Sequence, residues 1–170
     1  NRAHAPDVRV PDSTDFCAGI DVGGTKISSA LFTKTGGILG KTKVATAKSG
    51  GEQAADQIGE AVINLGQTAA RVGGRLLAVG ISVPGIVYSA SGKVWAPNIP
   101  GWDRFPLRDR LTGGEVGGRN APPAGSERGR ERQHAPQVRV PIVLESDRSA
   151  YVTGEAWQGA AAGAADVVFL

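Results

Sequence analysis

Two apolar segments joined by a short glycine turn constrain this chain more than any other feature. Residues 16–22 (FCAGIDV) and 27–33 (ISSALFT) each have the length and apolar content of a strand, and only GGTK separates them. Strands this close in sequence are expected to pair as an antiparallel hairpin. A third apolar segment, at 38–46, follows the turn KTGG. The sequence therefore predicts an antiparallel meander of three strands.

Helical and strand patterns alternate after this meander. Apolar residues recur at helical spacing over 52–72, which predicts a long amphipathic helix. Residues 75–83 (RLLAVGISV) form an almost uninterrupted apolar run, which is typical of a strand covered on both faces. The remaining expected elements are a hairpin around 91–92, a short helix at 105–111, a strand at 138–145, a helix at 146–163 and the start of a strand at 166–170. This order predicts an α/β fold.

Composition limits the class of protein. The chain has 170 residues, enough for one domain or slightly more, with 41% hydrophobic and 21% charged residues, as in soluble globular proteins. Its net charge of +3 is too small to indicate a nucleic-acid partner. No apolar run reaches the roughly 18 residues of a membrane span, and residues 1–15 lack the apolar core of a signal peptide, so we expect a cytoplasmic protein. Cys17 is the only cysteine, and we expect it to be a small buried hydrophobe.

Residues 112–137 differ in composition from the rest of the chain. They are rich in Gly, Pro and Arg and nearly free of large apolar side chains. Such a segment cannot bury enough surface to fold, so we expect a disordered, solvated insertion. The alternative is a basic patch for an anionic partner, although Glu127 and Glu131 interrupt the arginines. Residues 1–15 are polar, and we expect a flexible lead-in.

The glycine turn is the first candidate binding site. Gly23 and Gly24 have no Cβ to keep an anion from the backbone N–H groups, and Thr25 and Lys26 add a hydroxyl and a positive charge. A phosphate is the expected ligand. Asp21 would repel a phosphate directly but could hold a hydrated Mg²⁺ that bridges to it. The alternative is a plain Gly-Gly turn with Lys26 in solvent.

Two polar residues after predicted strands complete the candidate set. Asn98 lies between Pro97 and Pro100, where its amide could bind a polyhydroxyl ligand. The alternative is that Asn98 merely turns the chain. Asp147 lies at a strand-to-helix junction, where a carboxylate can cap the helix or act as a base. Both alternatives remain open at this point.

Five motifs follow one another along the chain: IDVGGTK, GISVPG, WAPNIPGW, VLESD and GEAWQGAAAGAADVVFL. In this order they resemble the amino-terminal half of ROK-family sugar kinases, particularly the glucokinase-like members. The resemblance covers 17–170 except for the insertion at 112–137. It implies an α/β, ribonuclease-H-like (actin-like ATPase) domain with a mixed sheet. Residues 16–170 would form the amino-terminal domain of a two-domain kinase, truncated before the second domain.

The resemblance also implies an activity, namely ATP-dependent phosphorylation of a glucose-like hexose at its 6-hydroxyl. Asp147 matches the catalytic base, which also binds the sugar, while Asn98 and Ser146 match sugar-binding positions. The first phosphate motif comprises Asp21, Gly23, Gly24, Thr25 and Lys26, and within it Asp21 would hold Mg²⁺ through water. Phosphoryl transfer depends mainly on positioning and charge neutralisation, which these residue types can supply.

By the same resemblance, the second phosphate motif, the adenosine pocket and the structural zinc site of the family lie beyond residue 170. We therefore expect this chain alone to be inactive. The expected partner is a hexose, with no nucleic acid and no membrane, and a homo-oligomer is expected at full length.

One motif departs from the pattern of the family. Where the family usually has Glu-Asn-Asp-Ala-Asn, this chain has ESDRS, residues 145–149. Ser146 is shorter than Asn, and Arg148 adds a charge beside Asp147. These changes leave open a non-catalytic sugar-sensing domain, as in ROK-type transcriptional repressors or a pseudokinase, although residues 1–15 are too short for a helix-turn-helix. A further alternative is a remnant that does not fold stably.

Overall fold

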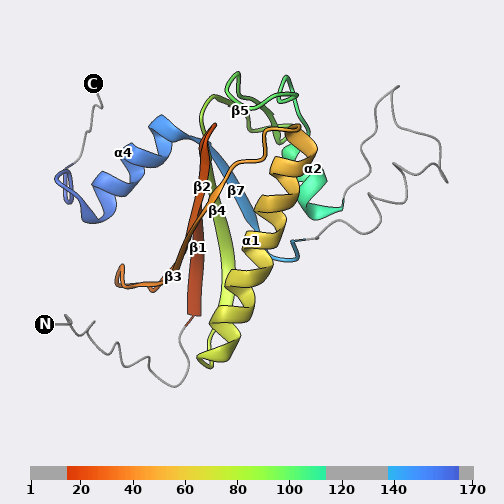
Figure 1. Ribbon diagram of the computed structural model, residues 1–170. Helices are drawn as coiled ribbons and strands as arrows, with labels where there is room; N and C mark the ends of the chain where they lie inside the picture. The colour runs from red at the N-terminus through yellow and green to blue at the C-terminus, as the bar shows by residue number, and fades with distance from the viewer. Residues whose placement is uncertain (1–14, 114–137, 165–170) are drawn as a thin grey trace, which may run out of the picture.

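The computed structural model describes residues 15–113 and 138–164, and its centre is a five-stranded mixed sheet (Figure 1). The strands lie in the order β3-β2-β1-β4-β7. The first three form the predicted antiparallel meander, while β4 and β7 extend it in parallel with β1. Their bounds are β1 Asp15–Val22, β2 Lys26–Phe32, β3 Ile38–Ala45, β4 Arg75–Val83 and β7 Ile142–Ser146.

Helix α1 (Gly51–Arg71) packs on one face of this sheet (Figure 1). Its apolar residues recur every three or four positions and therefore share one side, and Ala54, Ile58, Val62 and Leu65 are buried. They meet the inward side chains of the strands in the main hydrophobic core. The helix ends where the N–H groups of Val72, Gly73 and Gly74 donate to carbonyls of its last turn.

The smaller predicted elements are present with shifted bounds. The hairpin around 91–92 consists of β5 (Ile86–Tyr88) and β6 (Lys93–Trp95), paired antiparallel. The short helix is α2 (Leu107–Thr112), and the last described helix is α4 (Asp147–Gln158). None of the helices in the described residues is long and apolar enough to cross a membrane. Residues 1–14 of the lead-in predicted at 1–15, residues 114–137 of the insertion and the strand expected at 166–170 lie outside the described residues.

The prediction that β4 is covered on both faces is wrong. Val79, Ile81 and Val83 are buried on the side of α1, whereas Gly80, which alternates with them and so lies on the other side, is exposed. Figure 1 shows α4 on that other side, extending away from β7. A hollow separates α4 from the sheet. The apolar run gave no sign of this, because hydrophobicity alone does not tell whether the second face of a strand is covered.

The prediction that Cys17 is buried is also wrong, because its side chain is exposed. Side chains alternate along β1, so burial of Phe16 and Ala18 against the core places Cys17 on the opposite face. We therefore expect iodoacetamide to alkylate Cys17 in the native protein, and mass spectrometry of the undenatured chain would measure this. Alkylation only after addition of denaturant would show that the residue is covered in solution.

Candidate functional site

Thr46 stabilises the glycine turn between β1 and β2 through two hydrogen bonds. The Gly23 N–H donates to the Lys26 carbonyl at 2.8 Å, which closes the turn. Thr46 is buried, and its hydroxyl donates to the Gly23 carbonyl at 2.7 Å while its N–H donates to the Thr25 carbonyl at 3.1 Å. Thr25 and Lys26 are exposed. The turn is thus fixed in place, with its hydroxyl and cationic side chains in solvent.

Three polar side chains form a row across the carboxyl ends of neighbouring parallel strands. Asp21 of β1 pairs in register with Ser82 of β4, which pairs in turn with Glu145 of β7. Residues paired in register point to the same face of a sheet. The Ser82 hydroxyl donates to Asp21 Oδ1 at 2.9 Å and so orients this carboxylate. The sequence analysis missed Ser82 and Glu145, and polar residues at the ends of apolar strands were the available signal.

Asp147 is the first residue of α4, but it does not cap that helix. The N-cap is Ser146, whose hydroxyl accepts from the Ser149 N–H at 3.3 Å and lies 3.1 Å from the Ser149 hydroxyl. Among the described residues, Asp147 Oδ1 accepts a local bond from the Arg148 N–H at 2.8 Å. The capping alternative for Asp147 is therefore wrong. Ser146, a predicted sugar ligand, uses its hydroxyl within the helix start.

Two hollows meet at the start of α4. The first has a volume of about 600 Å³, lies between the sheet and α4, and is bordered by Asp21, Ser82, Glu145 and Asp147. The second has a volume of about 640 Å³ and is bordered by Asn98 and Trp95 on one side and again by Glu145 and Asp147 on the other. Asp147 therefore shares one hollow with Asp21 and the other with Asn98.

Asn98 also lies against the glycine turn. A Cβ built on Gly24 would be 2.9 Å from Asn98 Cβ and 3.0 Å from the Asn98 carbonyl oxygen. Such distances show that the two loops touch, and only glycine permits this approach. Of the predicted site residues, the structure thus brings together Asp21, Gly24, Asn98 and Asp147. Thr25 and Lys26 border neither hollow.

A magnesium ion would have to be held mainly by water. Within residues 15–113 and 138–164, no three Asp, Glu, His or Cys side chains cluster as in a preformed metal site. Asp21 is exposed and accepts one hydrogen bond from Ser82. A carboxylate has about four acceptor positions, so Asp21 retains room to bind a hydrated cation. This donor set suits Mg²⁺, which usually keeps several of its waters.

The sequence pattern of the ROK family matches residues 17–114. The glucokinase of Thermotoga maritima is 30% identical over 154 residues, which is 89% of this chain and 40% of that protein. The glucokinase of Streptomyces coelicolor is 31% identical over 151 residues, which is 88% of this chain and 38% of that protein.

Two crystal structures are similar in both fold and sequence. A ROK hexokinase from Thermus thermophilus has a TM-score of 0.62 and 30% identity, over 87% of this chain and 40% of that one. A ROK family glucokinase from Streptomyces griseus, in complex with glucose and AMPPNP, has a TM-score of 0.62 and 32% identity, over 87% of this chain and 38% of that one. The predicted actin-like ATPase fold with a mixed sheet is confirmed. The chain spans about two fifths of the length of these relatives, 40% and 38% of the two glucokinases.

Proposed function

This chain belongs to the ROK family, and on that premise we propose that it supplies half of the active site of an ATP-dependent sugar kinase. The substrate is a glucose-like hexose, phosphorylated at its 6-hydroxyl. Glucokinases among the relatives, and glucose with AMPPNP bound to one of the similar structures, support both the sugar and the nucleotide.

The position of Asp147 is the observation that carries this proposal. It borders one hollow with Asp21 and the other with Asn98, so a single carboxylate lies between the candidate phosphate side and the candidate sugar side. In the proposed reaction Asn98 binds sugar hydroxyls, and Asp147 accepts the proton of the 6-hydroxyl as the hydroxyl oxygen attacks the γ-phosphate of ATP and ADP leaves. The local bond from Arg148 N–H to Asp147 Oδ1 leaves the second carboxylate oxygen for the sugar.

The glycine turn and Asp21 serve the phosphate side. Because the Gly23 N–H is used inside the turn, we assign anion binding to the later part of the turn, where Thr25 and Lys26 are exposed. Asp21, oriented by Ser82, would hold Mg²⁺ through water. When bound, Mg²⁺ neutralises phosphate charge.

The same premise gives the domain organisation. Residues 16–170 are the ROK-type amino-terminal domain, with a lead-in at 1–15 and an insertion at 112–137. The coverage of 38–40% of the glucokinase relatives supports a requirement for a second domain. Phosphoryl transfer needs both substrates enclosed, so this domain acts with the remaining part of the site.

A coupled assay of ADP release with glucose tests the proposal. The chain of 170 residues is expected to show no turnover, because it holds the base and one phosphate loop without the enclosing partner domain. A form of the protein that covers the full length of its relatives is expected to turn over. Turnover by the shorter chain would contradict the requirement for a second domain, and no turnover by the longer form would contradict the kinase proposal.

A sugar-binding role without catalysis is the second candidate. The observation in its favour is that the Ser146 hydroxyl is bonded to Ser149 at the helix start, which removes one expected sugar contact. A buried sugar group left without its partner weakens binding by about 1–3 kcal/mol. Glucose binding with no ADP release in the longer form would favour this candidate.

A further inference from the structure

The loop that carries Asn98 is closed on itself. The Ala96 N–H donates to the Trp102 carbonyl at 2.9 Å, the Ile99 N–H to the Ala96 carbonyl at 3.1 Å, and the Trp102 N–H to the Ile99 carbonyl at 3.1 Å. Ala96, Ile99 and Trp102 are buried, whereas Asn98 is exposed. Asn98 therefore lies exposed on a compact loop. The position of this loop depends on the contacts that Trp102 makes with the rest of the chain.

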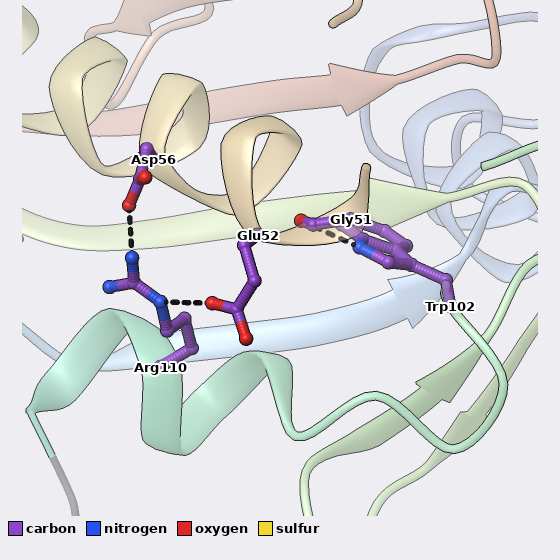
Figure 2. Close-up of polar contacts among 5 residues, drawn as sticks. All are labelled: Gly51, Glu52, Asp56, Trp102 and Arg110. Atoms are coloured by element: carbon purple, nitrogen blue, oxygen red, sulfur yellow. Dashed lines mark hydrogen bonds and ion pairs between the residues drawn. The ribbon is translucent and has the colours of Figure 1, made fainter. Parts of the chain in front are cut away.

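Trp102 is anchored to the first residue of α1. Its indole Nε1 donates to the Gly51 carbonyl at 3.0 Å, as Figure 2 shows, and its ring stacks on Phe105 with centroids 5.5 Å apart. A Cβ on Gly51 would be 2.3 Å from Trp102 Cδ1, so the helix must begin with glycine for the indole to fit. The Asn98 loop is thus bound directly to the start of α1.

Arg110 of α2 makes a second connection to the same part of α1. Its Nε donates to Glu52 Oε2 at 2.7 Å, and its terminal nitrogen pairs with Asp56, one helical turn further along (Figure 2). The Arg110 side chain is only 10% exposed. Charge-assisted hydrogen bonds are stronger than neutral ones, and Arg110 makes them to two carboxylates at once, although the side chains of Glu52 and Asp56 are 51% and 37% exposed. Arg110 fixes α2, and with it the segment that leads back to Trp102.

The glycine turn is connected to these turns of α1 through Gln57. The Gln57 side chain donates to the Ala45 carbonyl at 2.9 Å and accepts from the Ala47 N–H at 2.8 Å. Thr46 lies between these two residues and holds the glycine turn through Gly23. Residues from Gly51 to Gln57 therefore hold both loops.

We infer that the first two turns of α1 are a common base that sets the position of the two binding loops relative to each other. Arg110 is a positioning residue for Asn98, and Gln57 is a positioning residue for the glycine turn. The assignment of a ligand to each loop rests on the proposed function, whereas the hydrogen bonds and ion pairs that join the loops to α1 do not. The distance between the two loops is critical because Gly24 and Asn98 are in contact, so a shift of either loop would press it against the other.

Hydrogen exchange of the chain without ligand tests the connection alone. Arg110→Gln is expected to speed exchange of the Ala96, Ile99 and Trp102 amides by about tenfold, as expected for loss of a charge-assisted bond, while amides of β1 stay protected. Arg110→Lys should restore part of the protection. Arg71→Gln, a matched change at the exposed end of α1, should have no effect on these amides. Unchanged exchange in Arg110→Gln relative to Arg71→Gln would overturn the inference.

Crossed ligand titrations test the division of roles. Glucose and Mg-ATP are titrated separately into a form of the protein that covers the full length of its relatives, and binding is followed by NMR. Arg110→Gln is expected to raise Kd for glucose about tenfold with little change for Mg-ATP, and Gln57→Ala is expected to do the reverse. Gln67→Ala is the matched control, since Gln67 is exposed on α1. Equal losses for both ligands in each variant would indicate general destabilisation and would contradict separate roles.

Failure of ligand binding and unfolding of a variant can be told apart from failure of the inference. If a form of the protein that covers the full length of its relatives binds neither ligand, the proposed function fails, and the exchange measurement on the chain still decides the inference. If Arg110→Gln unfolds the whole chain, Glu52→Gln removes only one of the two ion pairs. It is then expected to speed exchange of the same three amides by a smaller factor, and no change would overturn the inference.

Discussion

Asp147→Asn is expected to lower kcat by about 10²–10⁴-fold in a form of the protein that covers the full length of its relatives. The amide keeps the size of the side chain but cannot accept the proton of the sugar hydroxyl. Because Ser146 rather than Asp147 caps α4, the substitution should leave the free energy of unfolding nearly unchanged. Coupled ADP release with glucose measures the rate, and urea denaturation measures the stability.

Asp103→Asn is the matched control for this prediction. Asp103 is exposed and borders neither hollow, so the same chemical change should leave kcat within about twofold. Near-normal turnover in Asp147→Asn would remove Asp147 from the role of base. The neighbouring Glu145, which borders both hollows, would then be the next carboxylate to test.

The parts of the fold that sequence patterns predicted are those set by local order. Residues 75–83 were predicted as a strand from an almost uninterrupted apolar run, and β4 is Arg75–Val83. The same local information could not say that the face of the sheet with Gly80 and Cys17, opposite α1, is left uncovered at these residues. Burial of a strand face depends on elements that pack there, and these are distant in sequence.

For the candidate site, too, sequence patterns predicted some of the residues and missed others. Asp21, the glycine turn, Asn98 and Asp147 were recognisable because each lies in a motif of a few residues. The connection between Arg110 and Glu52 joins residues 58 positions apart, and no periodicity or turn signal pairs them. The sequence therefore indicated which residues would meet a ligand, while the residues that hold them in place emerged only from the packing of α1, α2 and the loops.

The contact between Gly24 and Asn98 gives the second large expected effect. Gly24→Ala would place a methyl group 2.9 Å from Asn98 Cβ and 3.0 Å from the Asn98 carbonyl oxygen. Neither loop can yield easily, because Thr46 fixes the turn and Trp102 anchors the Asn98 loop. Overpacking of this kind costs about 1–3 kcal/mol. We expect Kd for glucose and for Mg-ATP both to rise by about 10–100-fold, as measured by NMR titration.

Gly66→Ala separates this effect from the general consequence of replacing glycine. A Cβ on Gly66, in the middle of α1, would meet Leu76 at 3.8 Å, which is ordinary contact. Alanine is favoured over glycine in a helix by about 1 kcal/mol, so Gly66→Ala should raise the free energy of unfolding and leave both Kd values unchanged. If Gly24→Ala also left both Kd values unchanged, the two loops would not depend on their close contact, and the shared spacing of the phosphate and sugar sites would have to come from the strands alone.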